Sequence, residues 1–245
     1  MASLFKSGAK ATEKMDSEWK WAGERNSLDK DRFNLISCLV LQKNKKYIDV
    51  GACRGEYIAM AQNSIPSESI YAFEPIPFMY RHLVSTFPNV NIFNVAVSNQ
   101  IGHGKFFVAN NEELSGLVER NSKFLPTGTV FEKIEVAIVT LDKIIENKNE
   151  VGLIKIDVEG NELAVLKGAE SIISQSRPTI YCEWGTNGPE NYNIAPESLF
   201  AWCVEHQYEI LTIDGQAIGD RELFLDSFYN WPIWNYLLIP KKQDI

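Results

Sequence analysis

The sequence predicts an α/β fold with a doubly wound, mainly parallel sheet of seven strands and an antiparallel C-terminal edge. Strand-like and helix-like segments alternate from about residue 31 to residue 207, which is typical of parallel strands joined by helices. The last two strand-like segments, Tyr208–Ile213 and Tyr236–Ile239, have no obvious helix between them and predict the antiparallel edge. A chain of 245 residues with 45% apolar and 23% charged residues fits one domain, residues 31–245, after a polar extension, residues 1–30.

The first half of the expected domain begins with a helix. Apolar residues recur at helical spacing in Asp31–Gln42, and Lys45–Val50 is a short apolar run that ends at a glycine, typical of a buried strand. We expect a helix over Gly55–Asn63 and the second strand over Ser69–Glu74. Pro77 fits the first turn of a further helix that runs to about Phe87.

The middle of the chain combines strands with a long loop. Asn91–Val97 is expected to be the third strand, and Lys105–Ala109 and Lys133–Val139 read as extra strands because their residues alternate or run apolar. The polar stretch Asn110–Thr129 between them predicts a long loop. Long loops in compact domains are often functional, so this segment is a candidate for shaping a binding site.

The second half repeats the strand–helix alternation. Thr140 is expected to cap a helix that runs through about Asn147. Val151–Asp157 and Thr179–Trp184 are the fourth and fifth strands, with a helix over Asn161–Gln175 between them and another over Pro196–Gln207 after them. Ligands bind beyond the carboxyl ends of the strands in such sheets, so those ends are expected to carry the function.

Composition argues against several classes of protein. The net charge of −8 disfavours a nucleic-acid partner. No apolar run reaches about 18 residues and Met1–Lys20 has no continuous apolar stretch, so neither a membrane partner nor a secretory signal is expected. The four cysteines form no C-x-x-C pair, which predicts no zinc site and suits reduced thiols in a cytoplasmic protein. The sequence indicates no oligomeric state.

The first strand leads into the motif Asp49-x-Gly51-x-x-x-Gly55. Cys53 stands where a dinucleotide-binding motif has its middle glycine. Two glycines still let a ligand approach the backbone closely, and the Asp49 carboxylate suits an ammonium group better than a pyrophosphate. S-adenosylmethionine carries such an ammonium group and no phosphate. The other interpretation is a tight strand-to-helix turn that binds nothing.

Glu74 ends the second strand, about 20 residues after the glycine turn. An acidic residue at that place can accept both ribose hydroxyls of an adenosine. Taken alone, Glu74 could instead be an ordinary carboxylate at a helix start. In order and spacing with Asp49 and Gly51 it predicts an adenosine site, which does not by itself separate S-adenosylmethionine from NAD.

The end of the fourth strand carries the densest group of acids. Asp157 falls at the carboxyl end of the strand, Glu159 lies in the following turn, and Glu162 starts the next helix. Gathering three acids in six residues is costly unless a cation, an ammonium group or a proton needs them. Alternatively, Glu162 complements the helix dipole and Lys155 neutralises the group. The position of these residues favours a site.

Several segments together resemble a known family. YIDVGACRGEY, YAFEPIPFMY, FNVAVSN, VTLDKI, LIKIDVEGNELAVLKGAE and PTIYCEWG occur in this order between about Lys45 and Gly185. They resemble the FkbM-type methyltransferases, a branch of the S-adenosylmethionine-dependent class I (Rossmann-like) fold. The K-I-D-V-E-G-x-E segment is the most specific part of the resemblance.

The resemblance implies a role for each motif residue. The amino acid end of S-adenosylmethionine would be held by Asp49, Gly51 and Gly55, its ribose by Glu74, its adenine near Ala96, and its methyl end by Asp157. The acceptor would lie near Ser115, Gly116, Glu159 and Glu162. Members of the family mostly methylate hydroxyl oxygens of sugars or natural products, so a small hydroxylated acceptor is implied. Trp184, at the end of a strand, is a further candidate to stack on a sugar or on adenine.

A hydroxyl is a poor nucleophile, so a base or a metal is expected to deal with its proton. Asp157 and Glu159 are the candidates for the base. Asp157, Glu159 and Glu162 could instead hold Mg²⁺, which is possible but not favoured because the sequence shows acids without a fixed ligand geometry. Two other functions stay open: a non-catalytic S-adenosylmethionine-binding module, and an NAD-dependent oxidoreductase or epimerase, against which Cys53 counts.

Overall fold

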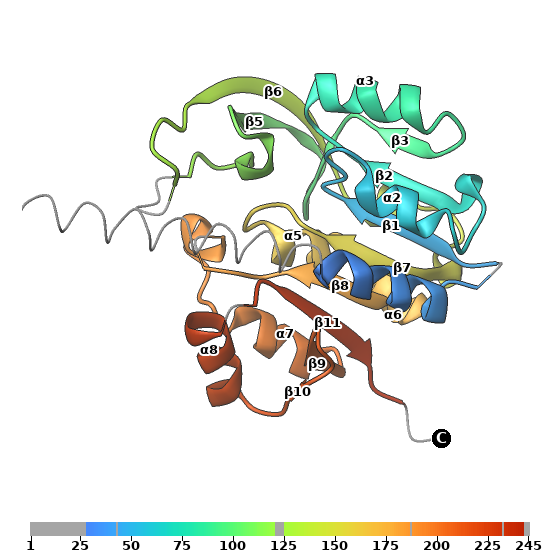
Figure 1. Cartoon of the computed structure of the whole chain (residues 1–245), viewed down its shortest axis with the longest axis vertical. Coiled ribbons are helices and arrows are strands. Elements are labelled where there is room, and N and C mark those ends of the chain that lie inside the picture. Colours follow the sequence, from blue (N-terminus) through green and yellow to red (C-terminus); the bar gives the residue numbers. More distant parts are fainter. Residues whose placement is uncertain (1–27, 43, 121–124, 187, 232, 243–245) are drawn as a thin grey trace, which may run out of the picture.

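The computed structural model describes residues 28–42, 44–120, 125–186, 188–231 and 233–242 (Figure 1). The expected N-terminal extension lies outside the described residues up to residue 27, and residues 28–30 belong to a helix that continues to residue 40. Within the part of the chain that the structure describes, no helix has the length and apolar character needed to cross a membrane.

The fold is α/β and its main sheet is mainly parallel, as predicted. Its strand order is β10-β9-β11-β8-β7-β1-β2-β3. The strands from β8 to β3 pair in parallel, and β11, β9 and β10 form the antiparallel edge. The strands are β1 (Lys46–Val50), β2 (Ile70–Phe73), β3 (Asn91–Phe93), β7 (Val151–Ile156), β8 (Thr179–Glu183), β9 (Tyr208–Thr212), β10 (Ala217–Ile218) and β11 (Asn235–Pro240).

The expected count of seven strands is wrong by one. The additional strand is β10, which has two residues and pairs with β9 through Ala217 and Ile218. A two-residue strand is too short to show the alternating pattern from which strands are recognised.

Helices cover both faces of the sheet (Figure 1). One core cluster joins the sheet to the helix of residues 28–40, α2 and α3 through Phe33, Ile58 and Leu83. The larger cluster joins the other face to α4–α8 and includes Leu166 and Phe224. The helices are α2 (Glu56–Ala61), α3 (Pro77–Thr86), α4 (Leu141–Ile144), α5 (Glu162–Lys167), α6 (Glu170–Ser176), α7 (Ser198–Glu205) and α8 (Arg221–Asn230). Short 3₁₀ turns are η1 (Ser67–Ser69), η2 (Glu112–Leu114), η3 (Lys148–Glu150) and η4 (Pro189–Tyr192).

A second, three-stranded sheet stands beside the main one (Figure 1). It consists of β4 (Ala96–Val97), β6 (Phe131–Val139) and β5 (Gly102–Ala109), with β5 and β6 antiparallel. The predicted third strand is therefore two strands, β3 and β4, in different sheets. Asn94 lies at the break, and its side-chain nitrogen donates to the carbonyls of Glu74 (2.9 Å) and Pro75 (3.0 Å), which directs the chain away from β2.

Two predicted helices differ from the structure. The helix expected over Asn161–Gln175 is divided into α5 and α6 at Gly168, where a Cβ atom would lie 2.2 Å from the carbonyl oxygen of Ser98. The carboxylate of Asp142 accepts hydrogen bonds from the backbone at the start of α6. Thr140 makes no side-chain bond at the start of α4, which is a single turn.

One helix was not predicted from the sequence. The segment between the last two predicted strands, where no helix was expected, contains α8, which begins after Asp220. The Asp220 carboxylate accepts a hydrogen bond of 2.8 Å from the backbone nitrogen of Leu223, a standard N-terminal cap.

Candidate functional site

A cavity of about 540 Å³ opens where the main sheet meets the second sheet. Residues that follow or end four adjacent parallel strands line it: Gly51 after β1, Glu74 after β2, Asp157 after β7 and Glu183 at the end of β8. Residues 112–115 and Leu117, from the loop after β5, line its other wall. This is the place where an open α/β sheet binds ligands.

The glycine turn after β1 forms part of the cavity floor. Gly51 has a φ of +82°, and a Cβ atom there would lie 1.9 Å from the carbonyl oxygen of Asp157, so glycine is required. Gly55 also has a positive φ, but it does not line the cavity. A Cβ atom on Gly55 would instead meet Phe87 (2.4 Å) and Leu83 (2.8 Å), so this glycine serves the packing of α2 against α3.

Asp49 is not where the sequence led us to expect it. Its side chain is fully buried and does not line the cavity, so the structure does not bring it to the place where the amino acid end of a cofactor was expected. Asp49 and Lys155 are paired residues on the neighbouring strands β1 and β7, and their charged atoms lie 3.6 Å apart. Burial raises the pKa of Asp49 to about 6, although the Lys155 charge opposes this.

Lys155 connects the turn to the end of β7. Its side chain is 2% exposed, and its Nζ donates to the carbonyl of Gly51 (3.2 Å) and to the carboxylate of Asp157 (3.1 Å). The same nitrogen lies 4.7 Å from the centre of the Tyr57 ring. Burial opposes the charge of Lys155, but Asp157 and Asp49 outweigh it and raise the lysine pKa. Lys155 is therefore a buried cation that fixes two walls of the cavity.

Glu74 lies in the cavity as predicted, and its carboxylate is held by the backbone. One oxygen accepts from the nitrogen of Cys53 (2.9 Å) and the other from the nitrogen of Ile76 (2.8 Å). Burial raises the pKa of Glu74 to about 7, against the effect of these two hydrogen bonds. Each carboxylate oxygen has a further lone pair, so Glu74 can still accept from ligand hydroxyls.

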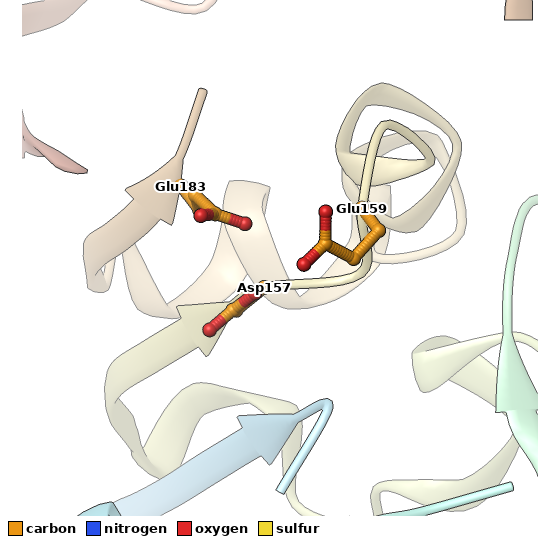
Figure 2. A group of neighbouring side chains, drawn as sticks. All are labelled: Asp157, Glu159 and Glu183. Atoms are coloured by element: carbon orange, nitrogen blue, oxygen red, sulfur yellow. The ribbon is translucent and has the colours of Figure 1, made fainter. Parts of the chain in front are cut away.

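Three carboxyl groups gather at the ends of β7 and β8. Figure 2 shows Asp157, Glu159 and Glu183 around a common space. One oxygen from each lies within 4.8 Å of the others, close enough to share a cation. Because β7 and β8 are parallel neighbours, their carboxyl ends bring Asp157 and Glu183 together. Glu159 reaches them from the turn after β7, where its backbone has a φ of +59°.

The electrostatic states of the three acids differ. Burial raises the pKa of Glu159 to about 8, although it pairs with Arg120. Burial and the charges of Asp157 and Glu159 raise the pKa of Glu183 well above its usual range. Burial acts on Asp157 in the same direction, but the Lys155 charge and the hydrogen bonds from Glu183 and Lys155 together outweigh it and lower the pKa of Asp157. The group therefore combines an ionised acid with two that hold protons readily.

Glu162 does not belong to this group. It is 1% exposed, does not line the cavity, and one of its oxygens accepts from the backbone nitrogens of Val158 (3.2 Å) and Gly160 (2.9 Å). The structure does not place Glu162 toward the cavity as expected, because its carboxylate is turned back onto the loop that precedes α5. In a set of oxygen ligands for a cation, Glu183 takes the place predicted for Glu162.

Of the other residues predicted to lie near the adenine and the acceptor, some line the cavity and some do not. Ala96 and Ser115 line the cavity. The Ser115 hydroxyl accepts a hydrogen bond of 2.9 Å from the backbone of Ala109, so it holds the loop in place. Gly116 forms a bridge with Phe107 and does not line the cavity, and a Cβ atom on it would lie 3.8 Å from the Cβ of Glu159.

Trp184 is a core residue. It is 1% exposed, its indole nitrogen donates to the carbonyl of Pro196 (2.8 Å), and it packs in the larger core cluster. The expectation that it stacks on a ligand is wrong, since its ring lies outside the cavity. The tryptophan that does line the cavity is Trp234, which is 39% exposed.

Glu183, Trp234 and Asp29 are among the cavity residues that sequence reasoning missed. Glu183 ends β8, and ligands bind beyond the carboxyl ends of the strands in open α/β sheets. The rule that pointed to Asp157 and Glu74 therefore pointed to Glu183 as well. Trp234 stands among several aromatic residues in residues 228–234, and no pattern in the sequence singles it out. Asp29, from the helix of residues 28–40, lines the cavity and accepts a hydrogen bond of 2.9 Å from Asn235. No sequence signal marked Asp29, since its helix only reaches the cavity through tertiary packing.

The family model for the methyltransferase FkbM domain matches residues 49–211. The chain belongs to the FkbM methyltransferase family. The match spans the glycine turn, Glu74 and all three acids of the group at the ends of β7 and β8. The predicted family is thereby confirmed. No curated protein matches the chain.

Solved structures similar to the chain are also methyltransferases. Methyltransferase FkbM from Methylobacillus flagellatus KT is 16% identical, with 81% of this chain and 44% of that chain covered and a TM-score of 0.49. The TehB-like SAM-dependent methyltransferase from Corynebacterium glutamicum is 8% identical, with 95% of this chain and 100% of that chain covered and a TM-score of 0.46. The FkbM family member described here thus spans less than half the length of the first of these structures.

Proposed function

We propose that this FkbM family member is an S-adenosylmethionine-dependent O-methyltransferase acting on a hydroxyl group of a small molecule, such as a sugar or natural product. The observation that carries the proposal is one cavity that joins a glycine turn, an acid suited to ribose hydroxyls and a group of three carboxyl groups. A volume of about 540 Å³ is within the usual range of small-molecule sites.

The residues present fit S-adenosylmethionine. Glu74 is fixed by two backbone donors and keeps lone pairs for ribose hydroxyls. Gly51 leaves the turn without a side chain where the ligand passes, and Ala96 leaves room for a flat base. Asp157, kept ionised by Lys155, suits the ammonium group that the sequence analysis assigned to Asp49.

S-adenosylmethionine supplies a methyl group on a positively charged sulfur. The protein's contribution is chiefly alignment of the acceptor oxygen with the methyl carbon and the sulfur. The acceptor oxygen bonds to the methyl carbon while the carbon–sulfur bond breaks, and the hydroxyl proton passes to a carboxylate. Glu159 is better suited to take it than Asp157, because a base works best with a pKa near the working pH and that of Glu159 is about 8.

A metal-assisted mechanism is the alternative for the same reaction. Asp157, Glu159 and Glu183 offer oxygen ligands of the kind that Mg²⁺ takes. Dialysis against a chelator distinguishes the two: activity is retained if a carboxylate is the base, and is lost and restored by Mg²⁺ if the metal is needed.

Fewer observations support the proposals for the cellular compartment and for the class of acceptor. All four cysteines are free thiols, which supports a reducing compartment such as the cytoplasm. The excess of acids in the chain and in the cavity supports a small-molecule acceptor rather than a nucleic acid.

Calorimetric titration with S-adenosylhomocysteine, with NAD as the comparison ligand, tests the cofactor. Saturable binding of S-adenosylhomocysteine alone supports the proposal, and binding of NAD alone overturns it in favour of an oxidoreductase. Release of S-adenosylhomocysteine with a hydroxylated acceptor, abolished in Asp157→Ala, then separates an enzyme from a module that only binds the cofactor.

A further inference from the structure

The helix of residues 28–40 brings a lysine to the cavity from outside the segment that the family model matches. Lys30 lines the cavity, and the match begins only at residue 49. Phe33, from the next turn of this helix, is fully buried. Its ring packs edge-on against Tyr57 of α2, with 4.6 Å between the ring centres, and against Tyr181 of β8 at 5.3 Å. Lys30 is therefore carried by an element that is packed onto the main sheet.

A series of contacts connects Lys30 with the acid proposed to bind the ammonium group of the cofactor. The Nζ of Lys30 lies 2.6 Å from the carboxylate of Glu56, which precedes Tyr57 at the start of α2. The centre of the Tyr57 ring lies 4.7 Å from the Nζ of Lys155, and that nitrogen lies 3.1 Å from the carboxylate of Asp157. All five residues line the cavity. Lys30 and Asp157 thus belong to one connected part of its wall.

The amino acid end of S-adenosylmethionine carries two opposite charges. Its ammonium group and its carboxylate are bonded to the same carbon atom, so their binding partners must lie near each other. The proposed function gives the ammonium group to Asp157, which leaves the carboxylate among acidic side chains. A negative charge there is favourable only if a cation lies close to it.

Lys155 is not available for this carboxylate. Its side chain is 2% exposed, and an ammonium group has three hydrogens to donate. Those of Lys155 face the carbonyl of Gly51 (3.2 Å) and the carboxylates of Asp157 (3.1 Å) and Asp49 (3.6 Å). A further anion would have to displace one of these buried partners.

Lys30 is better placed than the other exposed base of the wall. The Arg54 side chain is 58% exposed and is turned toward the loop after β5, where it pairs with Glu112 at 3.1 Å. The Lys30 side chain is 27% exposed, and its partner Glu56 is 54% exposed. Exposed ion pairs contribute little to stability, so Glu56 can share the ammonium group of Lys30 with a ligand or give way to it.

We propose that Lys30 binds the carboxylate of S-adenosylmethionine, so that the helix of residues 28–40 completes the cofactor site. This inference rests on the proposed function. Lys30 and Asp157 then recognise the two charges of the amino acid end from two sides of Tyr57. Such a pair makes the site selective for S-adenosylmethionine over nucleosides that lack an amino acid.

Three ligands with the same adenosine separate the two charges. S-adenosylhomocysteine carries both, decarboxylated S-adenosylhomocysteine keeps only the amine, and 5′-methylthioadenosine has neither. Their binding to the full chain is measured by calorimetry. Lys30→Met is expected to weaken binding of S-adenosylhomocysteine about tenfold, as for a lost charge-assisted hydrogen bond at a partly exposed site, without weakening binding of the other two ligands.

Further variants show whether the charge of Lys30 is responsible. Lys30→Gln should behave like Lys30→Met, and Lys30→Arg should restore most of the affinity because it keeps the charge. Lys46→Met is the matched control, since Lys46 pairs with Glu150 at 3.0 Å and does not line the cavity. Its affinity for S-adenosylhomocysteine should equal that of the unchanged protein. Melting temperatures show that each variant is folded.

The outcomes separate this inference from the proposed function. The inference alone is overturned if Lys30→Met and Lys30→Gln bind S-adenosylhomocysteine as the unchanged protein does. It is also overturned if they lose affinity equally for all three ligands, or if Lys46→Met loses as much. A protein that binds none of the three ligands overturns the proposed function, and with it the inference.

Discussion

The two sides of the cavity handle negative charge in different ways. On the side of β1 and β2, Glu74 receives two backbone hydrogen bonds and Asp49 lies in the interior beside Lys155. On the side of β7 and β8, Glu159 and Glu183 crowd against Asp157, with Arg120 paired to the first. On the first side the backbone fixes the ligand-facing carboxylate of Glu74, whereas the second side has more carboxyl groups than the described cations can balance.

This difference separates binding from chemistry. A carboxylate held by two backbone hydrogen bonds, as in Glu74, keeps a fixed geometry, which suits recognition of an invariant cofactor. Burial raises the pKa of Glu74 as well, but only at the ends of β7 and β8 do three carboxyl groups crowd together, where they can share a proton or attract a cation, which suits the reacting side. Changes on the two sides should therefore affect different measurements.

Lys155→Met is expected to have the largest effect because Lys155 touches both sides. It leaves the buried Asp49 without its cation and Asp157 without its hydrogen-bond donor, which should lower the free energy of unfolding by about 3–5 kcal/mol. Urea denaturation measures the loss. Adding Asp49→Asn should recover part of it, and a loss below about 1 kcal/mol would show that the pair is not important for stability.

Glu159→Gln should act on the rate alone. Loss of the base is expected to reduce turnover by about 10²–10⁴-fold, while the affinity for S-adenosylhomocysteine stays within about threefold. Single-turnover kinetics and calorimetry give the two values. Glu119→Gln, an exposed glutamate that does not line the cavity, is the control. Equal loss of rate and affinity would instead assign Glu159 a structural role.

Glu74→Ala should act on the affinity. Removing the carboxylate takes away the acceptor for ribose hydroxyls and leaves the backbone nitrogens of Cys53 and Ile76 without their partner. We expect binding of S-adenosylhomocysteine to weaken by about 1–3 kcal/mol. Calorimetry measures the change, and an unchanged dissociation constant would remove Glu74 from the cofactor site.

The smallest expected effect is on the pH dependence of stability. Burial raises the pKa of Glu74 to about 7 and that of Glu159 to about 8, against an ordinary value of 4.5. The folded protein then keeps protons that the unfolded chain releases, so this contribution is full below pH 4.5 and is lost as the pH rises through 7 to 8. The melting temperature without ligand should fall between pH 5 and 8.5.

Glu159→Gln supplies the comparison for this pH series. Because glutamine does not titrate, the fall in melting temperature between pH 5 and 8.5 should be smaller in the variant. An equal fall in both proteins would mean that the raised pKa of Glu159 does not contribute to stability.

The fold and the cofactor side follow from local patterns. Apolar runs ending in Gly51, Glu74 and Asp157 mark strands by their own residues, and the rule for open sheets places their ends together. The short β10 and the division of Asn161–Gln175 into α5 and α6 were not predictable in this way. The first has too few residues to show a period, and the second depends on contact between Gly168 and the distant Ser98.

The sequence by itself determined the α/β alternation, the family and the strand ends that line the cavity, because each depends on neighbours along the chain. Only the tertiary structure decided which acids reach the cavity. The pairing of β1 with β7 placed Asp49 beside Lys155, away from the cavity. The pairing of β7 with β8 placed Glu183 beside Asp157. Likewise, packing buried Trp184 and left Trp234 at the rim, because side-chain direction is settled by contacts between segments far apart in the sequence.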